Sequence, residues 1–142
     1  MHRVLLLGAG KIGRMIARFL VDTGDYQVRV ADADADALAR IAEKVTVDTV
    51  VVDAADKKQL VAAMDGCESV ISALSFTFNP TVALAALETG ASYFDLTEDV
   101  ATTRAVREIS AGAGKKQIFM PQCGLAPGFI SIVANHLTKS FD

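Results

Sequence analysis

The chain has 142 residues, of which 51% are hydrophobic and 22% charged, and its formal net charge is −3. Such a chain can bury roughly 70% of its unfolded surface as one ordered domain. The acidic balance, without a Lys/Arg cluster, argues against nucleic acid or an acidic membrane as the main partner, and the isolated Cys67 and Cys123 argue against a metal site.

The chain begins with a short apolar run, residues 4–7, that leads into the sequence Gly8-Ala9-Gly10-Lys11-Ile12-Gly13. The run suits a strand buried on both faces of a parallel sheet, and apolar residues at helical spacing follow it. In such a turn Gly8 allows a tight bend, Gly10 lets a pyrophosphate approach, and Gly13 lets the helix pack close to the sheet. A purely structural glycine turn is the competing interpretation.

A second strand is expected over residues 26–32, and it ends in a carboxylate, Asp32. Asp32 lies 19 positions after Gly13, the spacing typical of the acidic residue that binds the adenosine ribose. Alternatively, Asp32 opens the next helix, together with Asp34 and Asp36. A carboxylate at the ribose repels a 2′-phosphate, and with no arginine expected beside these acids we predict NAD in preference to NADP.

The third strand is predicted over residues 45–52, which are rich in β-branched side chains. Asp56 is the predicted N-cap of the helix that follows. Because the third strand of such a fold ends near the adenine, Asp53 and Ala54 are candidates for contacting it. A plain turn carboxylate is the alternative for Asp53.

The fourth strand is predicted over residues 69–74, and Asn79 is expected to cap the next helix. If this strand lies beside the first, the sheet changes direction between them. Ala73, Leu74 and Ser75 then line the crevice that holds the middle of the dinucleotide.

The remaining strands are predicted over residues 91–95 and 117–120, with a carboxylate of Glu98 or Asp99 capping the helix between them. Six strands alternating with helices predict an α/β fold, a three-layer doubly wound parallel sheet of the Rossmann type. The expected strand order is 3-2-1-4-5-6.

The loop Pro121-Gln122-Cys123-Gly124-Leu125-Ala126-Pro127-Gly128, with Phe94-Asp95-Leu96-Thr97 and the opening glycine turn, is similar to the saccharopine dehydrogenase family. Within that family it looks closest to lysine 6-dehydrogenase-like members. The resemblance implies a nicotinamide-dependent oxidoreductase of lysine metabolism that acts on the CH–NH group of an amino acid, of lysine or saccharopine type.

By the same resemblance, Lys11 and Ile12 join the three glycines in pyrophosphate binding, and Gly124 lies near the nicotinamide. No catalytic residue is assigned. Cys123 lies on this loop, but with no histidine near it in sequence we interpret it as a structural thiol.

Enzymes of this family continue into a substrate domain, whereas this chain ends at Asp142. The expectation is therefore a single dinucleotide-binding domain over residues 1–142, the N-terminal part of a longer cytoplasmic enzyme and inactive alone. The alternative is a regulatory NAD-binding module, and the Gly124–Gly128 loop favours the enzyme. Apolar residues on more than one face of the last helix predict a homodimer.

Overall fold

Six parallel strands form one sheet in the order β3-β2-β1-β4-β5-β6 in the computed structural model, which describes residues 1–141. The strands are β1 (His2–Leu7), β2 (Tyr26–Asp32), β3 (Asp48–Val51), β4 (Ser69–Ser72), β5 (Ser92–Asp95) and β6 (Phe119–Met120). This order confirms the predicted doubly wound sheet. The change of direction lies between β1 and β4, where ligands bind in such folds.

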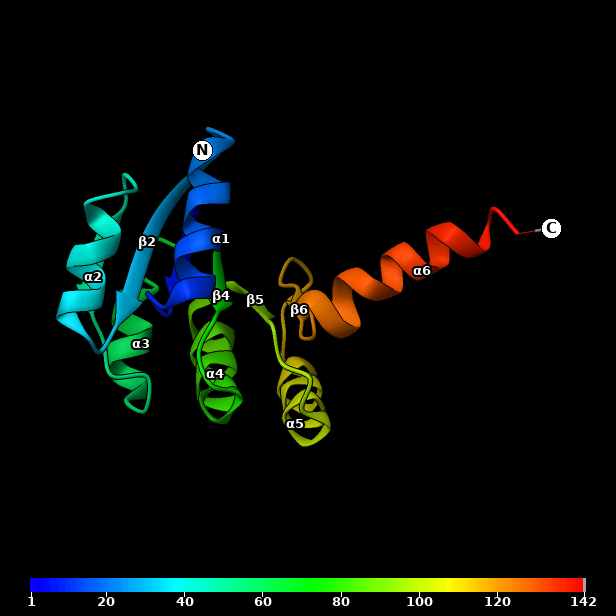
Figure 1. The fold of residues 1–142 in the computed structure, drawn as a ribbon. Coiled ribbons are helices and arrows are strands. Elements are labelled where there is room, and N and C mark those ends of the chain that lie inside the picture. Colours follow the sequence, from blue (N-terminus) through cyan, green and yellow to red (C-terminus); the bar gives the residue numbers. More distant parts are fainter. Residues whose placement is uncertain (142) are drawn as a thin grey trace.

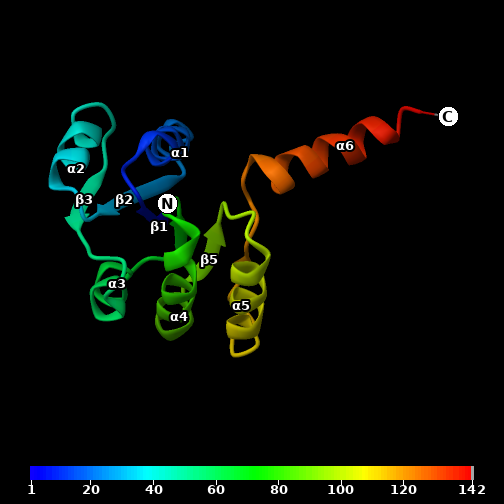
Figure 2. The same cartoon turned by 60° about the horizontal axis from the view of Figure 1, so that its bottom comes forward.

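Helices cover both faces of the sheet (Figures 1 and 2). They are α1 (Lys11–Asp22), α2 (Ala35–Ala42), α3 (Lys57–Ala63), α4 (Asn79–Thr89), α5 (Val100–Ser110) and α6 (Ile130–Thr138). Figure 2 shows α1 and α2 on one face and α3, α4 and α5 on the other, whereas α6 extends away from the sheet. Within residues 1–141, no helix has both the length and the apolar character needed to cross a bilayer.

The first strand is the centre of the core, because its successive side chains enter opposite layers. Leu5 and Leu7 pack in a cluster with Leu60 of α3, whereas Leu6 packs in a second cluster with Ile41 of α2. All of these side chains are at most 1% exposed. Burial on both faces explains why β1 is a continuous apolar run instead of an alternating one.

Four strands are shorter than predicted: β3 and β6 at the edges of the sheet, and β4 and β5 inside it, which end at Ser72 and begin at Ser92. Strand β3 begins at Asp48, because the amide of Val45 instead donates to the carbonyl of Ile41 and closes the end of α2. Strand β6 has two residues, because Gln117 closes a turn with the carbonyl of Gly114.

The predicted cap at Asn79 is wrong. Asn79 lies inside α4, whose N-cap is Phe78, because a short 3₁₀ turn, η1 (Phe76–Phe78), leads directly into the helix. The buried Asn79 side chain accepts a 2.7 Å hydrogen bond from the hydroxyl of Ser72. It therefore ties α4 to the end of β4.

Aspartates cap three other helices, as side-chain acceptors for first-turn amides. Asp56 caps α3, as predicted, and Asp99 is the capping member of the pair considered for α5. Asp34 caps α2.

Candidate dinucleotide-binding site

Two of the three glycines in the β1–α1 turn occupy positions that exclude a side chain. Gly8 has a φ of +102°, and a Cβ there would lie 2.9 Å from the carbonyl oxygen of Ala73. A Cβ on Gly13 would lie 1.8 Å from the carbonyl oxygen of Gly8. These contacts account for the tight bend and for the close packing of α1 on the turn.

Gly10 has the opposite environment, since no atom from outside its own stretch of chain lies within 4 Å of the place where its Cβ would be. It is the N-cap of α1 and offers no side-chain acceptor, and the first turn carries no acidic residue. The amides of Lys11, Ile12 and Gly13 open the helix, where intrahelical partners are lacking. The turn therefore presents an open, amide-lined face at the positive end of a helix, which suits an anion such as a phosphate.

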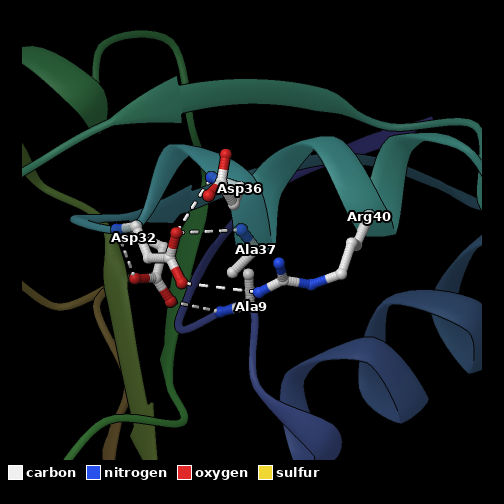
Figure 3. A network of polar contacts seen from close by, with 6 residues as sticks. Ala9, Asp32, Asp36, Ala37 and Arg40 are labelled. Atoms are coloured by element: carbon white, nitrogen blue, oxygen red, sulfur yellow. Dashed lines mark hydrogen bonds and ion pairs between the residues drawn. The ribbon is translucent and has the colours of Figure 1, made fainter.

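Asp32 lies beside this turn, at the end of β2, and its carboxylate joins two loops (Figure 3). One oxygen, Oδ2, accepts a 2.7 Å hydrogen bond from the amide of Ala9, and Oδ1 accepts one of 2.9 Å from the amide of Asp34. A carboxylate has about four acceptor sites, so it can still accept from hydroxyl groups. The alternative in which Asp32 opens α2 is wrong, because Asp34 accepts from the amides of Asp36 and Ala37.

An arginine lies beside this acidic cluster, contrary to the expectation from sequence. Nη2 of Arg40 is 3.4 Å from Oδ2 of Asp34, and both side chains are just over half exposed. The long arginine side chain folds back along α2 to the N-cap, which places it on the same side as Ala9 (Figure 3). Hydrogen bonds from helix amides, chiefly that of Ala37, lower the pKa of Asp34, and the Arg40 guanidinium adds to this effect.

The candidates for the adenine side lie at the same edge of the sheet. Asp32 is level with Val51 of β3, and Asp53 follows two residues later. The Asp53 carboxylate is exposed and accepts a 2.9 Å hydrogen bond from the amide of Ala55, as in the turn alternative. Ala54 is half-buried and packs against the core. Their contact with adenine stays a prediction.

A cavity of about 500 Å³ lies at the carboxyl ends of β4 and β5. Ala73, Leu74 and Ser75 line it, as the predicted crevice requires, together with Phe76 and with residues 96–99 after β5. Ile12 of α1 also lines it, so this residue lies between the glycine turn and the crevice. The volume is in the usual range for small-molecule and cofactor sites.

The loop after β6 packs against Leu96, one of the residues that line the cavity. A Cβ on Gly124 would lie 3.0 Å from the carbonyl oxygen of Leu96, so only a glycine allows this approach without displacement. Gly124 does not itself line the cavity. The loop continues through the π-helical turn η2 (Leu125–Phe129) into α6.

Cys123 is exposed on this loop, so it lacks the burial expected of a structural thiol. Its Sγ lies 3.1 Å from the carbonyl oxygen of Met120. Desolvation, with a further contribution from the Asp95 carboxylate, raises the pKa of the Cys123 thiol above its ordinary value. A raised pKa lowers the thiolate fraction, which is the nucleophilic form. In the described part of the chain, no group of three or more His, Cys, Asp or Glu residues is arranged to hold a metal ion.

The sequence analysis assigned no role of its own to one residue of the site, Asp95. Asp95 ends β5 fully buried and bonds to both the 96–99 segment and the loop after β6. The available signal was its position, since Asp95 ends its strand as Asp32 ends β2.

Comparison with known proteins places the chain within a family. The family model described as the saccharopine dehydrogenase NADP binding domain matches residues 4–120. The match covers the glycine turn, Asp32 and the crevice, and it ends before the Gly124 loop.

Similar solved structures extend over the whole chain. Apo saccharopine dehydrogenase (L-Glu forming) from Saccharomyces cerevisiae matches with a TM-score of 0.85 and 25% identity, over 99% of this chain and 31% of that one. A myo-inositol dehydrogenase from Corynebacterium glutamicum matches with a TM-score of 0.70 and 23% identity, over 99% of this chain and 42% of that one.

The WlbA dehydrogenase from Chromobacterium violaceum, solved with NADH and UDP-GlcNAcA, matches with a TM-score of 0.68 and 18% identity, over 84% of this chain and 34% of that one. The chain thus spans less than half the length of these structures, and the last two likenesses show the fold. From the family match over residues 4–120, the chain belongs to the family of saccharopine dehydrogenase NADP-binding domains.

Proposed function

We propose that the chain binds NAD across the carboxyl edge of its sheet, as the cofactor domain of an oxidoreductase that acts on the CH–NH group of an amino acid. The observation that carries this proposal is the position of Asp32. Its carboxylate lies between the open Gly10 turn and the start of α2, 2.7 Å from the amide of Ala9. This position suits recognition of a ribose whose pyrophosphate lies on the turn.

The proposed cofactor follows the sheet edge from β3 to β5. Adenine lies near Asp53 and Ala54, and the adenosine ribose bonds to Asp32. The pyrophosphate lies over Gly8, Gly10 and Gly13 and the first-turn amides of Lys11 and Ile12. The nicotinamide end enters the crevice lined by Ala73, Leu74 and Ser75, with Gly124 supporting the crevice from behind.

NAD is the proposed cofactor in preference to NADP, because two carboxylates lie near the place where a 2′-phosphate would be. Asp32 accepts from ribose hydroxyls, whereas a phosphate there would meet like charge. Arg40 is the counter-charge, but it is already engaged by Asp34 at 3.4 Å. The name of the matched family mentions NADP. The proposed preference for NAD therefore depends on whether the negative charges of Asp32 and Asp34 outweigh the positive charge of Arg40.

When bound, the nicotinamide would supply the hydride acceptor for oxidation of a carbon that bears nitrogen, and this chain would hold the ring in the crevice for that chemistry. The likeness to the saccharopine dehydrogenase of Saccharomyces cerevisiae, at 25% identity over the whole chain, supports a lysine or saccharopine type of substrate. The whole enzyme is proposed as a cytoplasmic homodimer, consistent with two free cysteines and an exposed apolar α6. This chain is proposed to supply the cofactor site and to be inactive without a substrate-binding partner domain.

A regulatory NAD-binding module is the second candidate, and the crevice lining favours it in one respect. Among the residues that line the cavity, only Glu98 and Asp99 are ionisable, and Asp99 is engaged in capping α5. Both candidate functions require the chain to bind a dinucleotide, and calorimetric titration with NAD and NADP tests this binding. We expect one NAD per chain, and no detectable binding of either dinucleotide would overturn the proposal.

A further inference from the structure

Asp95 and Tyr93 form a fully buried pair on β5, and both are 0% exposed. The Tyr93 hydroxyl donates a 2.6 Å hydrogen bond to Oδ2 of Asp95. Burial, followed by the bond to the Asp95 carboxylate, raises the pKa of Tyr93, so the phenol stays protonated and remains the donor. The pair is therefore a stable acceptor–donor unit inside the sheet.

The other carboxylate oxygen connects two segments that are distant in sequence. Oδ1 of Asp95 accepts from the amide of Thr97 at 2.9 Å and from the amide of Gln122 at 3.0 Å. The main-chain oxygen of Asp95 also accepts from the amide of Cys123 at 2.8 Å. Thr97 belongs to the crevice lining, whereas Gln122 and Cys123 belong to the loop after β6.

These bonds fix an unusual backbone conformation. Gln122 has a φ of +67°, which is uncommon for a residue other than glycine, and the Asp95 bonds hold the amides of Gln122 and its neighbour Cys123. The turn brings Gly124 against the carbonyl of Leu96, where a Cβ would lie 3.0 Å away. In this conformation the loop reaches Leu96, which lines the crevice.

The same network continues into the crevice. The hydroxyl of Thr97 accepts a 3.1 Å bond from the amide of Asp99, and Asp99 in turn caps α5 by accepting from the amide of Thr102 at 2.6 Å. Residues 97 and 99 are therefore both held, directly or through one partner, by Asp95. The side of the crevice that faces β5 has little freedom to move while these bonds persist.

We propose that Asp95 is a positioning residue for the nicotinamide half of the cofactor site. It holds residues 96–99 and the loop at 121–124 in one arrangement, so that the crevice is formed before the ligand arrives. A site held in its binding geometry loses less entropy when the ligand binds. This inference rests on the proposed function, because it places the nicotinamide end in the crevice.

Two ligands separate this role from a general contribution to stability. NADH carries the nicotinamide, whereas ADP-ribose carries the adenine, the pyrophosphate and both riboses but lacks the nicotinamide ring. We expect Asp95→Ala to weaken NADH binding by about tenfold, because the buried hydrogen bonds that hold the crevice are lost. ADP-ribose binding should weaken by less than about twofold. Calorimetry on the whole chain measures both.

Two further variants serve as controls. Asp95→Asn keeps an acceptor oxygen for the two loop amides while its amide group faces the Tyr93 hydroxyl, so it should restore NADH binding to within about threefold of the unmodified chain. Ile109→Ala removes a core contact at the opposite end of α5 and should leave both affinities unchanged. A purely structural role would not move the ratio of the two affinities.

The outcomes are distinguishable. If the unmodified chain binds neither ligand, the proposed function fails. If it binds both equally, or if Asp95→Ala leaves their ratio unchanged, the positioning role is overturned while cofactor binding stands. If Asp95→Ala does not fold, hydrogen exchange of the unmodified chain decides: slow exchange at the amides of Thr97 and Gln122 supports the role, and exchange as fast as in an open loop overturns it.

Discussion

The carboxylate of Asp32 accepts a 2.7 Å hydrogen bond from the amide of Ala9, and this bond joins the end of β2 to the glycine turn after β1. The residue at the proposed ribose position is therefore also part of the structure of the turn. Substitutions at this edge of the sheet should therefore change both ligand affinity and the free energy of unfolding. Which of the two changes more depends on the contacts of the substituted residue.

Gly10 and Gly13 should respond differently to the same substitution. Gly13→Ala should lower the free energy of unfolding by about 1–3 kcal/mol or more, because its Cβ would lie 1.8 Å from the carbonyl oxygen of Gly8. Gly10→Ala has open space and should cost less, about 0.5–1 kcal/mol for an alanine at the N-cap, yet it should weaken NAD binding where the pyrophosphate approaches. Urea denaturation and calorimetry measure the two effects, and unchanged NAD binding by Gly10→Ala would contradict the proposed approach.

The Asp34–Arg40 pair should set the tolerance for a 2′-phosphate. Asp34→Ser keeps an acceptor for the α2 amides but removes the charge that engages Arg40, so NADP binding should tighten by roughly threefold to tenfold while NAD binding stays the same. Adding Arg40→Gln to this variant should abolish the gain. An equal change in both affinities would show that the pair does not distinguish the cofactors.

The capping aspartates should make the protein sensitive to acid. Hydrogen bonds from helix amides, chiefly those of Ala37 and Thr102, lower the pKa values of Asp34 and Asp99 below 3.8 in the folded state. Their contribution to stability is therefore fully present above about pH 4 and is lost as the pH falls through the folded-state values. Urea denaturation between pH 2.5 and pH 7 should show a smaller acid-induced loss for Asp99→Asn, whereas Glu43→Gln, an exposed control, should retain the original profile.

The last helix should promote self-association. Phe129, Ile130, Ile132 and Leu137 are each more than half exposed, and no residue of α6 is buried. Covering this surface removes apolar area from water, at roughly 25 cal/mol per Å². Light scattering should show a mass that rises with concentration, and Ile132→Glu should reduce the rise; a constant monomer mass over a wide concentration range would argue against the homodimer.

The fold followed from local patterns, because each strand or helix carries its own apolar run or apolar spacing. The buried run before Gly8 predicted β1. The alternation of strands with helices along the chain predicted the strand order, which the structure confirms. The position of Asp32 relative to Gly13 likewise depended on spacing within one β–α–β unit.

Side-chain partners between distant segments could not be predicted in the same way. The amide of Gln122 finds the Asp95 carboxylate 27 positions away, and no local pattern encodes that contact. Asn79 carried a cap signal, but the preceding turn extended the helix and directed its side chain to Ser72. Arg40 was overlooked because its charge reaches Asp34 through a flexible side chain instead of through adjacency in sequence.

Calorimetric titration of Asp32→Ala with NAD and NADP tests the central claim most directly, with Asp36→Ala as a control that removes a neighbouring charge with no side-chain role in the turn. We predict tighter binding of NAD than of NADP by the unmodified chain. In Asp32→Ala, NAD binding should weaken by about tenfold and the gap between the cofactors should narrow, because the ribose loses its acceptor and the 2′-phosphate loses a repelling charge. Tighter binding of NADP by the unmodified chain, or unchanged NAD binding by Asp32→Ala, would contradict the account.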